Sequence, residues 1–343
     1  MISREAVREG TSLLVADIGG TNARFALVAV RGGELMLGPT TSLRTVAWPR
    51  LDDALDAFLE AEGRPPLAAA AICAAGPVEE AGKGKGGATI HLTNCPWNVN
   101  ADAIARVTGV VAPRLMNDFA ALALAVPALT AADLHRAGET GEGIPGAPVV
   151  AIGAGTGLGV ASLVFDEGGR AHVVAGEGGH VDLAPKGKRE AAALAHLETH
   201  FGHVSAERVL SGPGLATLHA TLVALNGDLP MPLTPEEIAR RAHEGSCEIS
   251  RETVSLFCGW LGAVAGNVAL TLGARGGVYI AGGIVPAWVG AMPGLFDEAL
   301  FRARFEAKGR LGPWMRKIPS FVVTRPDAAL LGLARAARES IGV

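Results

Sequence analysis

The stretch DIGGTNARFAL, residues 17–27, places two glycines, a threonine and an asparagine between two apolar runs. Apolar runs joined by a glycine-rich turn are typical of a pair of β-strands. Glycine lets consecutive backbone N–H groups point into such a turn and lets a ligand approach closely, and those N–H groups together bind anions. The turn at residues 19–22 could therefore hold a phosphate group. Asp17 at its entrance could hold Mg²⁺ or its water shell.

The second half of the chain repeats this pattern. An apolar run leads into GAGTGLG, residues 153–159, and another apolar run follows. Two similar hairpins, one in each half, suggest a duplicated fold with two facing lobes. Two such turns could clamp a polyphosphate, the second one through Gly155, Thr156 and Gly157. The alternative is a pair of tight hairpins without a ligand.

Two common nucleotide-binding motifs do not account for these turns. Nothing in the chain matches the GxxxxGKS or GxxxxGKT pattern of a Walker A loop. The glycines of the second turn alternate strictly, which is the wrong spacing for the GxGxxG of a Rossmann fold.

Length and composition restrict the class of protein. With 343 residues, of which 49% are hydrophobic, two globular domains are expected. The net charge is −4 and there is no basic run, so a nucleic-acid partner is not expected. The four cysteines are scattered and form no CxxC, which disfavours a disulfide framework or a zinc ribbon and fits a reducing cytoplasm. Residues 1–10 lack the apolar core of a signal peptide.

One segment, residues 254–274, carries no charge and is long enough to span a bilayer. Gly262 and Gly266 in it form a GxxxG pattern. We favour the alternative, a buried helix of a soluble protein in which small residues allow close packing. It would be the only such segment and it contains Asn267, so no membrane partner is expected.

Strand and helix patterns alternate, which indicates an α/β class. Strands are predicted in the first forty residues and over 67–75, 88–93, 114–116, 149–152, 160–165 and 278–281. Helices are predicted over 52–60, 101–108, 119–128, 190–200, 235–243, 253–272 and 327–340, with a further helix beginning at 206 after Ser205 as its N-cap.

Several polar residues are candidates for substrate contacts. Asn117 and Asp118 follow a short strand, where they could hold vicinal hydroxyls and accept a proton, or could form an Asx turn that caps the next helix. In GEGGH, residues 176–180, Glu177 and His180 lie among glycines that suit a loop wrapped around something small. A favourable negative charge at a helix N-terminus would by itself account for Glu207, without a role in binding.

Three histidines, His196, His200 and His203, fall at i, i+4 and i+7. Their sequence is not HExxH, and Gly202 is expected to end the helix. We therefore expect an exposed or packing role rather than a zinc site.

Taken together, the motifs resemble the bacterial glucokinase family, which lies in the superfamily of sugar kinases, Hsp70 and actin. The shared blocks occur in order from Asp17 to about Pro286. They are DIGGTNARFAL, MNDFAA, GAGTGLGVA, GEGGHVDLAP, GHVSAERVLSGPGL and GGVYIAGGIVP, with LLGLARAA near the C-terminus.

The resemblance implies an actin-like ATPase fold with two α/β domains, a duplicated ribonuclease-H-like core and the active site in the cleft between the domains. The smaller domain would comprise 1–128 and 326–343, and the larger one 129–325. The implied reaction is phosphorylation of D-glucose on its 6-hydroxyl by ATP with Mg²⁺. A cytoplasmic homodimer is also implied.

The resemblance also assigns roles to individual residues. Asp118 would be the general base. Glucose would be bound by Asn117, Asp118, Glu177, His180 and Glu207. Phosphates and metal would be handled by Ala16, Asp17, Ile18, Gly19, Gly20, Thr21, Gly155, Thr156 and Gly157, with Gly282 and Gly283 near the adenosine and Asp17 at the metal.

Other functions on the same scaffold remain alternatives. Related kinases of the repressor, open reading frame and kinase family carry a cysteine-rich zinc motif that these cysteines cannot form, so no zinc is expected. A sugar-responsive regulator would need a DNA-binding domain, for which the few residues before the first strand leave no room. A kinase for mannose or fructose differs only in which hydroxyls are recognised. Residues 1–11 and the loop 82–87 have no evident role.

Overall fold

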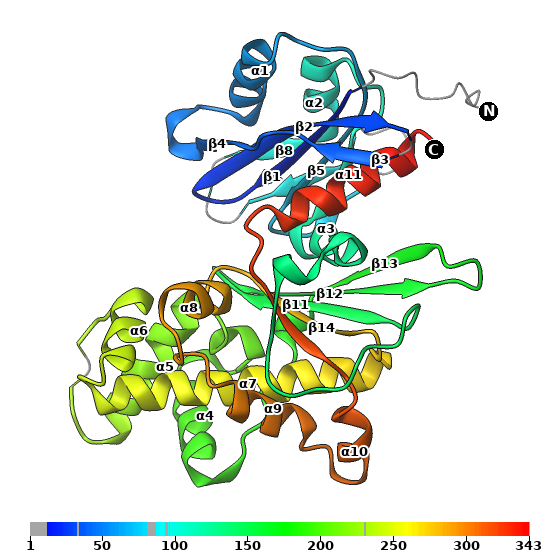
Figure 1. Ribbon diagram of the computed structural model, residues 1–343. Helices are drawn as coiled ribbons and strands as arrows, with labels where there is room; N and C mark the ends of the chain where they lie inside the picture. Colours follow the sequence, from blue (N-terminus) through cyan, green and yellow to red (C-terminus); the bar gives the residue numbers. More distant parts are fainter. Residues whose placement is uncertain are drawn as a thin grey trace. The chain divides into compact units, whose positions relative to one another are not determined.

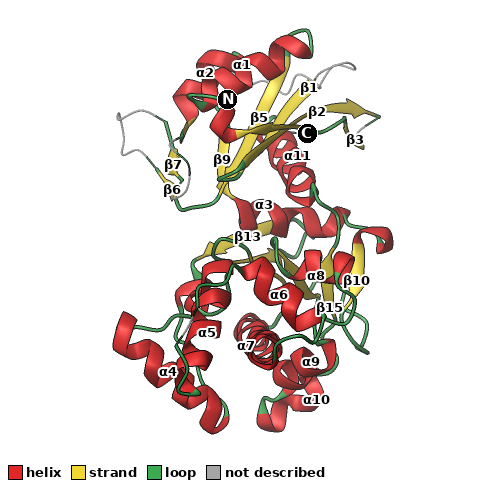
Figure 2. Ribbon diagram, turned by 90° about the vertical axis from the view of Figure 1, so that its left-hand side faces the viewer, coloured by secondary structure: helices red, strands yellow, loops and turns green. Residues whose placement is uncertain are grey.

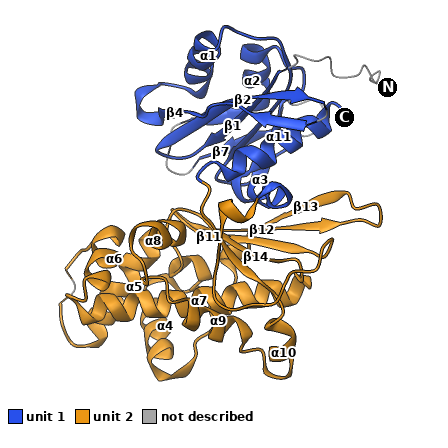
Figure 3. Ribbon diagram, viewed as in Figure 1, with its two compact units in different colours: residues 1–129, 326–343 blue, residues 130–325 orange. Residues whose placement is uncertain are grey.

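The computed structural model describes residues 12–32, 34–80, 87–92, 95, 97–229 and 231–342. Residues 1–11 and most of the loop 82–87 lie outside this part of the chain. The chain forms two compact units, Met1–Leu129 with Pro326–Val343 and Thr130–Arg325 (Figure 3). Each has its own sheet and its own apolar core.

The sheet of the first unit has the strand order β3-β2-β1-β5-β9, with β4 paired to β2. Strands β1, β5 and β9 are parallel, whereas β2 runs antiparallel to β1. A small second sheet contains β6, β7 and β8. The strands are β1 (Ser12–Ile18), β2 (Asn22–Arg31), β3 (Glu34–Leu37), β4 (Thr41–Arg44), β5 (Leu67–Ala74), β6 (Val78–Glu79), β7 (Thr89–His91), β8 (Asn98–Asn100) and β9 (Arg114–Asn117).

Helices lie on both faces of the main sheet (Figure 2). Side chains of α1 (Leu51–Ala61) and α2 (Ala101–Thr108) share a core with alternate residues of β1 and β5. The C-terminal helix α11 (Ala328–Ser340) packs on the sheet and on α3 (Asp118–Ala125). The backbones of α3 and α11 approach so closely that a Cβ atom at Gly332 would lie 1.8 Å from the Ala121 carbonyl oxygen.

The second unit repeats the strand order of the first. Its sheet reads β13-β12-β11-β14-β15, extended by β10. As in the first unit, a β-hairpin (β11–β12) is followed by two strands parallel to its first strand. The strands are β10 (Leu134–Arg136), β11 (Val149–Ala154), β12 (Leu158–Phe165), β13 (Ala171–Gly176), β14 (Gly277–Ala281) and β15 (Ser320–Val323). The duplication predicted from the two hairpins is therefore present in the topology of both sheets.

Helix α7 (Glu248–Leu272) is the predicted apolar segment, and it packs against the sheet of the second unit (Figure 1). In the described part of the chain it is the helix long and apolar enough to cross a membrane, yet 67% of its most apolar window is buried within the protein. Gly262 and Gly266 face α9 (Glu298–Glu306), where Cβ atoms would lie 2.2 Å and 2.6 Å from the carbonyl oxygens of Phe301 and Phe305. The GxxxG pattern thus serves packing inside the unit.

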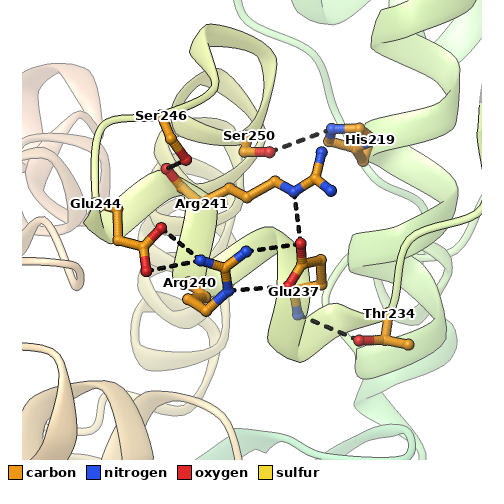
Figure 4. A network of polar contacts seen from close by, with 8 residues as sticks. All are labelled: His219, Thr234, Glu237, Arg240, Arg241, Glu244, Ser246 and Ser250. Carbon is orange, nitrogen blue, oxygen red and sulfur yellow. Dashed lines mark hydrogen bonds and ion pairs between the residues drawn. The ribbon is translucent and has the colours of Figure 1, made fainter.

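Five further α-helices complete this unit: α4 (Gly187–Phe201), α5 (Gly212–Leu225), α6 (Pro235–His243), α8 (Val285–Ala291) and α10 (Gly312–Met315). A polar cluster joins α5, α6 and the start of α7 (Figure 4). Hydrogen bonds from Arg240 and Arg241 lower the pKa of Glu237 to about 2. Beside this ion pair, His219 is buried next to Ser250, and burial lowers the His219 pKa.

Two predicted helices differ from those observed. The helix expected to begin at 206 is a single 3₁₀ turn, η5 (Ala206–Arg208), and Ser205 makes no side-chain cap, so that expectation was wrong. The true cap is Ser211, whose hydroxyl accepts a hydrogen bond from the Gly214 N–H at the start of α5. The helix predicted over 119–128 ends at Ala125 and continues as a 3₁₀ turn that contains Pro127, which cannot donate to the helical ladder.

The close approach of α3 and α11 predicts that Gly332→Ala is destabilising. A methyl group there overlaps the Ala121 carbonyl, so the helices must separate, and we expect a loss of about 1–3 kcal/mol in the free energy of unfolding. Urea unfolding followed by circular dichroism measures it. The matched control is Gly290→Ala in α8, where no atom lies within 4 Å of the added methyl and no loss is expected. Equal stability of the two variants would contradict this account of the packing.

Candidate active site

The candidate residues of the first unit lie where its parallel strands end. The strand register places Asp17 of β1 beside Cys73 of β5, and Cys73 beside Met116 of β9. Asn117 and Asp118 follow directly at the end of β9 and the start of α3. In α/β sheets, ligands bind outside the carboxyl ends of such strands. The fold therefore gathers two carboxylates and an amide at the edge where a ligand is expected.

Asp17 is held on both sides by its neighbouring strands. Its Oδ2 atom lies 3.1 Å from Nη1 of Arg24 on β2, and its Oδ1 atom accepts a hydrogen bond from the Cys73 thiol at 3.5 Å. The Asp17 side chain is 19% exposed, so it is anchored but still reaches solvent. Sequence reasoning assigned no role to Arg24 or Cys73.

The pKa of the Cys73 thiol is affected by both carboxylates, Asp17 and Asp118. The Cys73 side chain is fully buried, and burial is the largest reason that its pKa lies well above the usual value. The charges of Asp17 and Asp118 raise this pKa further. The thiol is therefore a neutral group next to two carboxylates.

Asn117 is the N-cap of α3. Its Oδ1 atom accepts hydrogen bonds from the N–H groups of Phe119 (2.9 Å) and Ala120 (3.3 Å), and its Nδ2 atom donates to the Gly76 carbonyl at 3.2 Å. Asp118 is the first residue of the helix and accepts from the Phe119 N–H at 2.9 Å. The Asx-cap alternative is thus confirmed for Asn117. It leaves a role in binding open, because the cap uses the amide oxygen and one donor.

The first glycine turn is braced from outside. The Gly19 N–H donates to the Asn22 carbonyl within the turn (2.9 Å). Thr45, which is buried, donates its hydroxyl to the Gly20 carbonyl at 2.7 Å and its N–H to the Thr21 carbonyl at 3.0 Å. Gly20 and Thr21 are exposed. The side chains of two further candidates, Ala16 and Ile18, are fully buried, so they could meet a ligand only through their backbone.

The second glycine turn joins β11 to β12. Its Gly155 N–H donates to the Gly157 carbonyl, and the Gly155 carbonyl accepts from Gly212 N–H at the start of α5, both at 2.8 Å. Thr156 is exposed at the tip. These bonds fix the turn in one conformation beside the N-terminus of α5.

The Gly282–Gly283 pair packs beside this turn. Gly282 has φ +82°, and a Cβ atom there would lie 2.4 Å from the Ala154 carbonyl oxygen, so this position requires glycine. A Cβ atom at Gly155 would lie 3.7 Å from the Gly283 nitrogen, and Gly283 itself has open space around it. The turn expected to bind phosphates (155–157) and the pair expected to lie near the adenosine (Gly282 and Gly283) are therefore neighbours in the second unit.

Glu207, in η5, is tied to the start of β12. Its Oε2 atom accepts the Leu158 N–H at 2.8 Å, and a Cβ atom at Gly157 would lie 2.4 Å from the same oxygen. The position of the Glu207 carboxylate therefore requires a glycine at 157. The earlier interpretation of Glu207 as a helix N-terminal charge was wrong, because no α-helix begins there.

The segment with Glu177 and His180 forms η4 (Gly178–His180), with both side chains exposed. This segment packs on β12, the strand that Glu207 also contacts. A Cβ atom at Gly179 would lie 2.1 Å from the Leu158 carbonyl oxygen, and one at Gly178 would lie 2.9 Å from Val160 Cβ. The Ala206 N–H also donates to the Val181 carbonyl at 2.9 Å. Two of the three glycines are thus explained by packing on β12 rather than by wrapping a ligand.

Of the three spaced histidines, His196 and His200 lie in α4 and His203 follows that helix. The rings of His196 and His200 are tilted by 40° to each other, with centroids 5.0 Å apart, and His203 pairs with Asp182 at 2.8 Å. His200 and His203 are exposed, and His196 is half-buried. Within the described ranges, no group of three or more His, Cys, Asp or Glu side chains is placed to hold a metal ion.

Comparison with known proteins now bears on this arrangement. The family model described as "Glucokinase" matches residues 14–340. This chain belongs to the glucokinase family. It is 43% identical to a glucokinase of Chromobacterium violaceum over 94% of this chain and 88% of that one, and 42% identical to a glucokinase of Yersinia pestis over 97% and 98%.

A solved structure extends the agreement to the fold. The crystal structure of a glucokinase from an Antarctic psychrotroph superposes with a TM-score of 0.83 at 33% identity, over 96% of this chain and 99% of that one. The resemblance read from the sequence motifs is confirmed, and so is the α/β, actin-like ATPase fold that it implied. All the motif blocks lie inside the matched range.

The contact between Gly157 and Glu207 gives a direct test of how the site of the second unit is built. In Gly157→Ala the added methyl displaces the carboxylate, so the Leu158 N–H loses its acceptor and exchanges with solvent deuterium about tenfold faster. Hydrogen–deuterium exchange of the 155–165 segment measures it. Gly176→Ala, which adds a methyl in open space near the same loop, is the control and should leave this exchange unchanged. Unchanged exchange in Gly157→Ala would show that the carboxylate is not held as described.

Proposed function

We propose that this chain transfers the γ-phosphoryl group of ATP to the 6-hydroxyl of D-glucose, with Asp118 as the general base. Membership of the glucokinase family, at 42–43% identity over 94–97% of the chain, is the observation that carries the activity. The chain is an ATP-dependent glucokinase. The assignment of individual residues is our own proposal and follows from their placement in each unit.

Asp118 has the position that a general base needs. It is half-buried at the first position of α3, where the helix dipole favours its negative charge. In the reaction, a carboxylate oxygen accepts the proton of the 6-hydroxyl as the hydroxyl oxygen attacks the γ-phosphorus in line. The new P–O bond forms to glucose while the bond to the β-phosphate oxygen breaks, and ADP leaves.

Each unit holds candidates for binding the sugar hydroxyls. Asn117 offers its amide nitrogen, because its oxygen caps α3. In the second unit, Glu207 would accept hydroxyl hydrogen bonds with a carboxylate that the Leu158 N–H already orients. Glu177 and His180 are exposed on the neighbouring η4 and would complete this set. Fixed acceptors and donors favour the sugar whose hydroxyls match them.

The glycine turn of each unit is a candidate for binding the phosphates of the nucleotide. The 155–157 turn and the adjoining Gly282–Gly283 pair supply backbone groups on which phosphates and adenosine can lie closely. In the first unit, the 19–21 turn, with Asp17 just before it, would bind the transferred phosphoryl group. N–H groups that are already in place stabilise the charge that spreads over the phosphoryl oxygens without reorganising during the reaction.

Asp17 is the residue that fits a magnesium ion. Each of its oxygens has one protein partner and keeps acceptor capacity, and its side chain reaches solvent. A single carboxylate suits Mg²⁺, which is commonly held by one or two carboxylates together with phosphates and water. When bound, the ion would supply neutralising charge at the phosphates. We further propose that the enzyme is a cytoplasmic homodimer with no nucleic-acid or membrane partner.

The base assignment predicts that Asp118→Asn lowers kcat by about 10²–10⁴-fold, because the amide cannot accept the proton. The assay couples glucose 6-phosphate to a dehydrogenase, with ATP and Mg²⁺ present. Asp102→Asn, which makes the same change in the first turn of α2, is the matched control and should leave kcat within about twofold. A kcat for Asp118→Asn within tenfold of wild type would exclude Asp118 as the base.

The substrate assignment predicts that glucose gives a much higher kcat/KM than mannose, fructose or N-acetylglucosamine, in an assay that follows the release of ADP and so detects phosphorylation of any sugar. Discrimination should reach about 10²-fold or more, since a mismatched hydroxyl leaves a polar group of the site unpaired. Comparable values for another hexose would assign a broader hexokinase. If no sugar were phosphorylated by wild type, the site would be one for binding only, as in a sugar-responsive regulator.

A further inference from the structure

Cys73 is a buried polar group that the proposed reaction does not use. It lies on β5 in the sequence LAAAAICA, where the residues on either side are an isoleucine and an alanine that face the α1–α2 core. The Cys73 side chain points to the other face, where Asp17 lies, and none of it is exposed. Alanine occupies most of this strand, so an apolar contact alone does not explain a thiol here.

The register of three strands forms a row of side chains across the sheet. Arg24, Asp17 and Cys73 are paired neighbours on β2, β1 and β5. Cross-strand partners project to the same face, so the carboxylate stands between a guanidinium and a thiol. Arg24 Nη1 contacts Oδ2 at 3.1 Å and Cys73 Sγ donates to Oδ1 at 3.5 Å.

We propose that Cys73 is a positioning residue of the kinase, whose thiol hydrogen bond fixes the orientation of the Asp17 carboxylate. This inference rests on the proposed function, in which Asp17 acts at the transferred phosphoryl group. The two contacts restrain different oxygens, so they fix the rotation of the carboxylate as well as its place. A carboxylate held in this way need not be reoriented each time a nucleotide binds.

The chemistry of the thiol suits this place. A thiol donates only weakly, so it leaves the charge of Asp17 available to the ligand, whereas a second cation would compensate it. Because Cys73 is buried on the inner side of Asp17, its hydrogen bond is not exchanged with water. Arg24 is 38% exposed on the other side, and its charge is screened by solvent.

The experiment compares Cys73→Ala and Cys73→Ser with wild type. Alanine removes the donor, and we expect kcat to fall about tenfold, with the KM for glucose unchanged. Serine restores a donor at nearly the same place, and we expect kcat within about threefold of wild type. The matched control is Cys258→Ala in α7, an equally buried cysteine away from Asp17, which should lower Tm comparably and leave kcat unchanged.

Two kinetic outcomes would overturn the proposal: a wild-type kcat in Cys73→Ala, or a Cys73→Ser variant as impaired as Cys73→Ala, since both point to packing alone. A second measurement does not depend on turnover. The infrared S–H stretching band of Cys73 is identified as the band that is present in wild type and absent from Cys73→Ser, and that of Cys258 is identified in the same way with Cys258→Ala. The Cys73 band should lie at lower frequency than the Cys258 band. Asp17→Asn should shift the Cys73 band. A Cys73 band insensitive to Asp17→Asn would refute the hydrogen bond. An inactive wild type would refute the proposed function instead, and the infrared result would still decide the contact.

Discussion

The register of three parallel strands is the constraint on which the proposed chemistry of the first unit depends. Because β1, β5 and β9 run in the same direction, their last residues meet at one edge, and the pairing of Asp17 with Cys73 and of Cys73 with Met116 fixes which side chains meet there. A shift of one residue in either pairing would turn Asp17 or Cys73 to the opposite face. Leu14, Ala16 and Ile18 of β1 pack in the core shared with α1 and α2, and Asp17 projects to the opposite face. The core of this unit thus sets the geometry of the site.

In the second unit, packing also fixes the positions of the candidate polar groups, but through different side chains. Its sheet repeats the strand order of the first, yet the polar groups come from loops that pack on the β11–β12 hairpin. Leu158 connects them, since its N–H is bonded to Glu207 and its carbonyl lies against Gly179. The glycines at 157, 179 and 282 are needed because backbone or carboxylate atoms occupy the space of a side chain. Each unit of the duplicated scaffold therefore presents a glycine turn and at least one carboxylate, which are Asp17 and Asp118 in the first unit and Glu207 in the second.

The sequence predicted the fold well because its signals are local. Gly109 ends α2 in the left-handed conformation, and Thr234 with Pro235 begins α6, as their residue types predict. The hairpins could be recognised from glycine and threonine between apolar runs. The α5 helix was missed because its start, Ser211, lies only a few residues after the false start at 206. Local signals could not separate one 3₁₀ turn from a helix.

The site was less predictable, since it depends on pairing between distant segments. Nothing within LAAAAICA indicates that Cys73 contacts Asp17, 56 positions earlier, because only the register of β1 with β5 brings them together. Thr45, which braces the first turn, has the same kind of origin. Asn117 shows the opposite case: the sequence left two interpretations open, and the cap is observed while a role in binding stays a proposal.

The most direct test of the central claim is a crystal structure of this chain with glucose and a non-hydrolysable ATP analogue. We expect the glucose 6-hydroxyl within hydrogen-bond distance of an Asp118 oxygen, with the other hydroxyls on Asn117, Glu177, His180 and Glu207. We also expect the phosphates at the 155–157 turn and on the side of Asp17. Glucose bound with its 6-hydroxyl away from Asp118, or phosphates away from both turns, would contradict the account.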